Sequence, residues 1–191
     1  MRKCYIVPGA NSQAEQYARV LNQVQEVEFE PVAVHIDWGH TNGSGKSSFI
    51  DLSRQVKRQV AHANKGDAVL CFSYGAVASF LDTNPKLDYL FCSLTNVFDI
   101  KRRKVYDHVT KPVSMAWDEM DSVNLEDILK RERARWVFLC GEKESEDYRA
   151  VSRNLAHRSQ SMILEVAQAV HDIESGLYPE TIRSELLKLK F

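Results

Sequence analysis

A serine in the middle of the chain stands in the sequence context of a catalytic nucleophile. Ser73 directly follows an apolar run at residues 68–72 and comes two residues before Gly75. In a nucleophile elbow the serine occupies a tight turn between a strand and a helix, and the residues two before and two after it must be small. Gly75 meets this requirement fully and Cys71 meets it adequately. The pattern predicts a reactive hydroxyl at the carboxyl edge of a sheet, with a simple helix cap as the alternative.

A serine hydroxyl is a weak nucleophile unless a base removes its proton and an acidic group orients that base. Two later loops carry residues of these types. Glu144 follows the apolar run 136–140, and His171 follows the apolar run 162–166. The order serine, acid, histidine is one that a catalytic triad can have along a chain. We therefore expect His171 to activate Ser73 and Glu144 to orient His171, although His171 taken alone could be an ordinary loop histidine.

Both assignments have alternatives close by in the sequence. Glu142, Glu146 and Asp147 lie within reach of the position that we assign to Glu144. His157 is the second candidate base, but it falls inside a helical pattern that follows the acid loop. The choice of base is therefore clearer than the choice of acid.

Six short apolar runs predict the sheet that must position these residues. Each run is rich in Val, Ile, Leu, Phe or Cys, and a helical or polar stretch separates it from the next, as in strands that are buried on both faces. The runs are 4–7, 32–36, 68–72, 89–94, 136–140 and 162–166.

Helical patterns alternate with these runs. Four segments have apolar residues spaced by three and four, which is typical of a helix with one apolar face. The segments are 12–24, 49–63, 147–155 and 179–189. The alternation predicts an α/β fold, a three-layer α/β/α sandwich in which helices cover both faces of a mainly parallel six-stranded sheet.

One stretch interrupts the alternation. Residues 98–130 contain no clear strand, and a helical pattern starts near their end, at 125–133. We therefore expect residues 98–130 to form a short lid. A chain of 191 residues is close to the size of one domain. We therefore expect residues 1–191 to form a single domain with at most this insertion.

The sequence resembles a small α/β-hydrolase-fold serine hydrolase with a short or absent cap. The resemblance covers essentially the whole chain and rests on five segments that match family motifs at strand ends. These are 6–10 for the first core strand and its H-G-x turn, 36–44 for D-x-x-G-H-G-x-S, 71–75 for G-x-S-x-G, 141–144 for G-x-x-D, and 170–172 for the histidine loop.

The resemblance implies a mechanism and a set of residues. Ser73, Glu144 and His171 would form the catalytic triad, and the backbone N–H groups of Ala10 and Tyr74 would form the oxyanion hole. The activity would be hydrolysis of a small-molecule carboxylic ester or thioester through an acyl-enzyme intermediate. Such chemistry requires no metal and no organic cofactor.

Three residues depart from the family pattern. Pro8 stands where the family usually has histidine, Cys71 where it usually has glycine, and Glu144 where aspartate is commoner. Because a fold does not guarantee a chemistry, these departures favour a second hypothesis, a catalytically silent binding protein of the same fold.

A competing motif predicts nucleotide binding. Residues 43–47 read Gly-Ser-Gly-Lys-Ser and resemble the end of a phosphate-binding P-loop. The complete motif needs a glycine at the position of His40, and Gly39 is one residue too far away. No apolar run ends in the aspartate that such proteins use toward magnesium. A P-loop-like nucleotide-binding protein is therefore the third hypothesis, and a Gly/Ser loop that caps a helix is the plain alternative.

Composition excludes several other classes. The 25 Lys and Arg residues against 26 Asp and Glu residues give a net charge of -1, which disfavours nucleic acid as a partner. The N-terminus lacks a signal-peptide apolar region, and no stretch approaches the roughly 18 apolar residues of a membrane span. The four cysteines lie in apolar runs without a C-x-x-C pair. We expect a soluble cytoplasmic protein with buried, reduced thiols.

Overall fold

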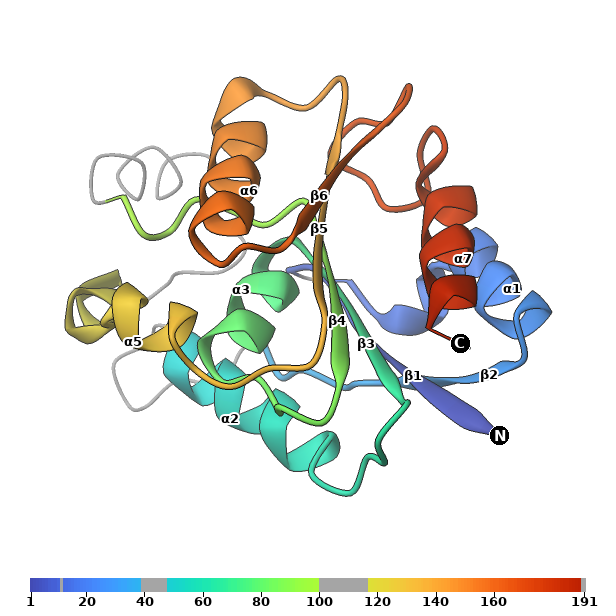
Figure 1. The fold of residues 1–191 in the computed structure, drawn as a ribbon, viewed down its shortest axis with the longest axis horizontal. Helices are drawn as coiled ribbons and strands as arrows, with labels where there is room; N and C mark the ends of the chain where they lie inside the picture. The colour runs from blue at the N-terminus through green and yellow to red at the C-terminus, as the bar shows by residue number, and fades with distance from the viewer. Residues whose placement is uncertain (11, 39–47, 100–116, 190–191) are drawn as a thin grey trace.

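The computed structural model describes residues 1–10, 12–38, 48–99 and 117–189 of the chain. A single sheet of six parallel strands runs through these residues, and helices cover both of its faces (Figure 1). The strand order is β2-β1-β3-β4-β5-β6. The strands are β1 (Arg2–Val7), β2 (Phe29–Ala33), β3 (Ala68–Phe72), β4 (Asp88–Cys92), β5 (Trp136–Gly141) and β6 (Met162–Val166). The predicted α/β/α architecture is confirmed.

The helices divide between the two faces of the sheet. Helices α1 and α7 lie side by side on one face, and α2, α3 and α6 lie on the other (Figure 1). The helical elements are η1 (Ala14–Gln16), α1 (Ala18–Glu26), α2 (Phe49–Gln59), α3 (Ser73–Leu81), η2 (Trp117–Ser122), α5 (Leu125–Leu129), α6 (Glu146–Arg158) and α7 (Tyr178–Lys188).

Strand β3 shows why the central strands are readable from sequence. Its five residues are all buried, because helices pack on both sides of it. Val69 and Cys71 belong to the core on the α2 and α3 face, and Leu70 and Phe72 belong to the core on the α1 and α7 face. Successive side chains thus alternate between two apolar cores.

The second strand differs from the prediction. The sequence indicated 32–36, whereas β2 spans Phe29–Ala33 and pairs with β1 alone. The strand contains Pro31, which lacks the N–H group that a central strand needs and is tolerated at an edge. The prediction for this strand was wrong because it took the apolar run that follows the proline.

One helical segment also differs from its predicted bounds, and the expected lid is described only in part. The pattern at 12–24 divides into η1 and α1, with Tyr17 between them in a non-helical conformation. Residues 100–116 of the expected lid lie outside the described part of the chain, and the rest of it carries η2 and α5. The lid and the single domain over 1–191 remain predictions.

The parallel arrangement places all carboxyl ends of the strands at one edge of the sheet. Ser73 directly follows β3, and the loops that contain Glu144 and His171 follow β5 and β6. This edge is where open α/β sheets bind their ligands. Among the described residues, none of the helices is both long and apolar enough to cross a membrane.

Candidate active site

Ser73 occupies a strained turn between β3 and α3. Its φ angle is 53°, in the left-handed region that residues other than glycine seldom adopt. Gly75 makes the turn possible, because a Cβ atom at that position would lie 2.1 Å from the carbonyl oxygen of Pro8. Cys71, the other small position, is fully buried and donates a hydrogen bond from Sγ to the Leu90 carbonyl at 3.4 Å. This is the local geometry of a nucleophile elbow.

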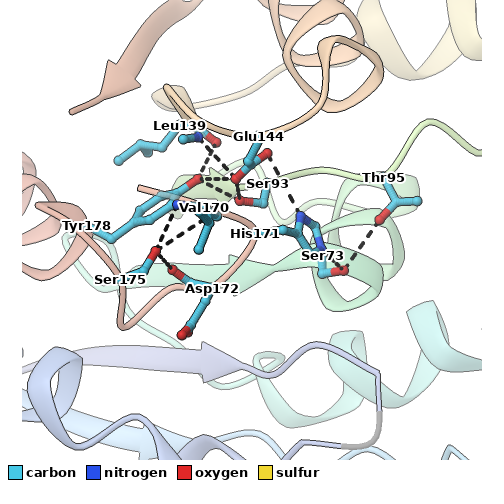
Figure 2. A network of polar contacts seen from close by, with 11 residues as sticks. Ser73, Ser93, Thr95, Leu139, Glu144, Val170, His171, Asp172, Ser175 and Tyr178 are labelled. Atoms are coloured by element: carbon cyan, nitrogen blue, oxygen red, sulfur yellow. Dashed lines mark hydrogen bonds and ion pairs between the residues drawn. The ribbon is translucent and has the colours of Figure 1, made fainter. Parts of the chain in front are cut away.

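His171 lies beside the Ser73 hydroxyl. The distance from His171 Nε2 to Ser73 Oγ is 3.0 Å, within hydrogen-bond reach (Figure 2). The imidazole packs against two aromatic rings, with centroid distances of 5.1 Å to Phe72 and 4.2 Å to Tyr148. These contacts restrict the rotation of the imidazole that faces the serine.

The loop that carries His171 is fastened to α1 by Glu174. The Glu174 carboxylate accepts hydrogen bonds from the backbone N–H groups of Arg19 and Val20, at 2.8 Å and 2.9 Å, in the first turn of α1. In return, the Arg19 guanidinium donates to the Glu174 carbonyl at 2.5 Å and lies 3.5 Å from the carbonyl of Gly176. The loop that carries His171 is therefore attached to α1 by both the side chain and the backbone of Glu174.

Glu144 stands behind the histidine. Its Oε2 atom lies 3.9 Å from His171 Nδ1, and its side chain is fully buried (Figure 2). Within the described part of the chain, neither of these two atoms has a hydrogen-bond partner. At 3.9 Å the two atoms are about 1 Å farther apart than in a hydrogen bond, and the contact becomes an ion pair when the imidazole carries a second proton. The structure thus brings together Ser73, His171 and Glu144 in the order that a triad requires.

Two of the alternative acids, Glu142 and Glu146, and the alternative base His157 have other surroundings, and the third acid, Asp147, lies in the first turn of α6. Glu142 accepts a hydrogen bond from the backbone N–H of Gln168 at 3.0 Å. Glu146 pairs with arginines on the exposed side of α6, and His157 is exposed on the same helix. No contact of these three side chains with Ser73 or His171 appears within the described residues.

The two predicted oxyanion donors flank the serine turn. Ala10 follows Gly9, whose N–H donates to Tyr17 Oη at 3.0 Å and whose carbonyl accepts from the Ser12 hydroxyl at 2.8 Å. The Gly9 N–H is thus committed to Tyr17, and Ala10 supplies the next N–H along the chain. Tyr74 is the second residue of α3, in the helix turn where N–H groups favour an anion.

Sequence reasoning missed three residues at this site. Thr95 is buried and its Oγ1 lies 3.4 Å from Ser73 Oγ, whereas Ser93 and Tyr178 contact Glu144. The hydroxyl residues Ser93 and Thr95 come just after β4, which is a signal that could have placed them at the same sheet edge. Nothing in the local sequence around Tyr178 indicates its contact.

Three further features of the sequence concern phosphate binding, metal binding and the cysteines. The P-loop-like segment at 43–47, together with Gly39 and His40, lies outside the described residues. In the part of the chain that is described, no group of three or more His, Cys, Asp or Glu side chains could hold a metal ion. All four cysteines are free and buried.

No protein-family model matches the chain, and no curated protein matches its sequence. Solved structures do match. An alpha/beta hydrolase enzyme from the metagenome of sediments from the lagoon of Mar Chica, Morocco, superposes with a TM-score of 0.73 at 13% identity, over 98% of this chain and 89% of that one. A thermophilic esterase from Thermogutta terrifontis gives 0.71 at 12% identity, over 100% and 91%.

A third structure, a monoacylglycerol lipase from Paleococcus ferrophilus, gives a TM-score of 0.68 at 15% identity, over 97% of this chain and 93% of that chain. In each of these three comparisons, the superposition covers most of both chains. The chain therefore has the α/β-hydrolase fold, and the fold that the sequence resemblance implied is confirmed.

Proposed function

We propose that this protein is a serine hydrolase that cleaves a carboxylic ester or a thioester. The observation that carries the proposal is the 3.0 Å contact between Ser73 Oγ and His171 Nε2 at a left-handed strand-to-helix turn. An activated serine needs both features, a hydroxyl raised out of the sheet edge and a base within hydrogen-bond reach. Similarity to solved structures of esterases and a lipase supports hydrolysis as the class of reaction.

The proposed reaction has two acyl-transfer steps. His171 Nε2 takes the proton of Ser73 as Oγ attacks the carbonyl carbon, and the carbonyl oxygen becomes an oxyanion that the N–H groups of Ala10 and Tyr74 stabilise. His171 then gives the proton to the leaving alcohol or thiol, which leaves the acyl group on Ser73. Water attacks the acyl carbon while His171 takes a proton from it, and His171 then returns this proton to Ser73 Oγ as the bond between the acyl carbon and Oγ breaks and the acid product departs. Glu144 stabilises the imidazolium in both steps.

Labelling with a fluorophosphonate probe tests the proposal directly. We expect the probe to modify the wild type at Ser73, as located by mass spectrometry of the labelled peptide. Ser73→Ala and His171→Ala should lose the adduct, whereas His157→Ala, which changes the exposed histidine of α6, should label like the wild type. A folded wild type that takes up no label, or an adduct on another serine, would overturn the assignment of Ser73.

A second candidate function is a catalytically silent binding protein of the same fold. The observation in its favour is the 3.9 Å separation between Glu144 Oε2 and His171 Nδ1, which is too long for a hydrogen bond. Hydrolysis of p-nitrophenyl butyrate separates the two functions. A hydrolase turns over the ester and loses that activity in Ser73→Ala, whereas a silent protein releases nitrophenol no faster than Ser73→Ala does.

A further inference from the structure

One oxygen of the Glu144 carboxylate is surrounded by hydrogen-bond donors. Oε1 accepts from the Gly141 N–H at 3.1 Å and from the Tyr178 hydroxyl at 3.0 Å, and it also accepts from the Ser93 hydroxyl (Figure 2). Ser93 Oγ and Tyr178 Oη lie 2.6 Å from each other. Glu144 Oε1, Ser93 Oγ and Tyr178 Oη thus form a buried cluster in which each oxygen lies within hydrogen-bond reach of the other two.

The two hydroxyl groups come from elements that the fold holds rigidly. Ser93 directly follows β4, is fully buried, and has a φ angle of 51°, a left-handed conformation like that of Ser73. Tyr178 is the first residue of α7 and is also fully buried. Because α7 packs along α1 (Figure 1), the position of the phenol is set by helix packing and not by a mobile loop.

Both hydroxyls can act only as donors toward the carboxylate. Burial and the charge of Glu144 raise the pKa of Tyr178 well above its ordinary range, so the phenol keeps its proton. The phenol lies near three acceptors, namely the Ser93 hydroxyl at 2.6 Å, Glu144 Oε1 at 3.0 Å and the Leu139 carbonyl at 3.5 Å. The Leu139 contact is the longest and weakest of the three, so the phenol donates to Glu144 directly or to Ser93, which in turn donates to Glu144. In both of these arrangements Glu144 is the final acceptor.

The hydrogen bonds to Glu144 Oε1 determine the direction in which the other oxygen, Oε2, points. A glutamate has one more rotatable bond than the commoner aspartate, so its carboxylate has more orientations to lose. The Gly141 N–H and the two linked hydroxyl groups around Oε1 oppose rotation of the carboxylate. Oε2 is then the atom that faces His171, and the described residues offer it no hydrogen-bond partner.

We propose that Tyr178 and Ser93 are positioning residues that fix the Glu144 carboxylate with Oε2 directed at His171. Their hydroxyls contact Glu144 and each other, so they act through the acid. The histidine loop runs from β6 into α7, so one segment carries both the base and the phenol that orients the acid. The inference rests on the proposed function and adds two residues to its machinery.

A double-mutant cycle with a matched control tests this proposal. Tyr178→Phe removes only the phenol oxygen. Tyr89→Phe is the control, because Tyr89 is equally buried and its hydroxyl accepts a hydrogen bond from the backbone N–H of Asn84 at 2.8 Å, away from Glu144. Each variant is made alone and together with Glu144→Gln. The measurements are the rate of fluorophosphonate labelling, kcat and KM for p-nitrophenyl butyrate, and the melting temperature.

We expect Tyr178→Phe to lower the labelling rate and kcat about tenfold with KM unchanged, the size of one lost hydrogen bond to a charged group. The added loss should vanish in the Glu144→Gln background, because the phenol then has no oriented carboxylate to act through. Tyr89→Phe should lower the melting temperature similarly and leave both rates as they are. A full tenfold loss that persists with Glu144→Gln, or no loss in Tyr178→Phe, overturns the inference.

Ser93→Ala keeps the test decisive if Tyr178→Phe does not fold. The same cycle with Glu144→Gln applies to it, with the same expected non-additive loss. Failure of the inference and failure of the proposed function remain distinguishable. If wild type labels at Ser73 and both variants label at the wild-type rate, only the positioning role is wrong. If wild type itself takes no label, the triad is wrong and the positioning role falls with it.

Discussion

Gly75 lies against the backbone of Pro8, so closely that a Cβ atom on Gly75 would stand 2.1 Å from the Pro8 carbonyl oxygen. This contact joins the helix that follows the nucleophile to the turn that follows β1. The same turn continues into Gly9, which donates to Tyr17, and into Ala10, a proposed oxyanion donor. The absence of a side chain at position 75 thus allows the close approach of the Ser73 turn to the turn after β1, which carries the proposed oxyanion donor.

Gly75→Ala should therefore damage both stability and reactivity. The added methyl group meets backbone on one side, so α3 or the Pro8 turn must move, at a cost of about 1 to 3 kcal/mol. We expect the free energy of urea unfolding to fall by this amount and labelling at Ser73 to drop strongly. Cys71→Ala is the comparison, because it removes an atom from the other small position and adds none. Equal labelling in Gly75→Ala and wild type would show that the contact is unimportant.

Because Ser73 has a left-handed conformation, we expect a glycine at position 73 to be more stable than an alanine, which is the reverse of the usual order in a helix. At φ 53° an alanine carries the left-handed penalty and a glycine does not, so Ser73→Gly should be more stable than Ser73→Ala by about 1 kcal/mol. Ser79 provides the control within the same helix α3. Ser79→Gly should be less stable than Ser79→Ala by about 1 kcal/mol, the usual order inside a helix. Thermal unfolding of the four variants checks both signs, and the same order at both positions would contradict the strained turn.

The structure also shows how far such residues can be predicted from a sequence. That Ser73, Glu144 and His171 lie at one edge of the sheet could be predicted because each comes after an apolar run, and runs buried on both faces are easily recognised. Strand β2 was misplaced because Pro31 looks like a strand breaker, and only the sheet order shows that β2 is an edge strand.

Tyr178 could not have been predicted in this way. It lies 34 residues after Glu144 along the chain, at the start of a helix with an ordinary apolar pattern. Its contact with the carboxylate depends on how α7 packs along α1, which is a long-range result of the fold. The place of Glu144 after a strand could be predicted from the local sequence, whereas its contact with the Tyr178 phenol could not.

Because the histidine loop is attached to α1 through Glu174, we expect a substitution of Glu174 to lower the reactivity of Ser73. Glu174→Ala removes the acceptor for the N–H groups of Arg19 and Val20 and should cost about 1 kcal/mol of stability, as for a lost helix cap. The freed loop should also lower the labelling rate at Ser73. Glu180→Ala is the matched control, because Glu180 pairs with the same Arg19 side chain in an exposed ion pair of small energy. Equal labelling in both variants would show that the attachment does not position His171.

The buried cysteines predict that stability declines in alkali. Burial raises the pKa of Cys4 to about 12, whereas an exposed thiol titrates at about 8.5. Between these values the unfolded chain has lost the proton and the folded chain has kept it. The free energy of unfolding therefore falls as pH rises, by about 1.4 kcal/mol per pH unit for each such thiol, and the stabilisation is complete only below the pKa of the exposed group.

Cys4→Ala isolates one of these thiols. The variant loses packing at every pH, but it has no thiol at position 4 that could keep its proton in the folded chain and lose it in the unfolded chain. The gap in free energy of unfolding between wild type and Cys4→Ala should narrow by about 1.4 kcal/mol per pH unit above pH ~9, and should be constant between pH 6 and 8. Urea unfolding at a series of pH values measures the gap. A gap that stays constant through alkaline pH would mean that Cys4 releases its proton equally in both states, and that its burial does not control its titration.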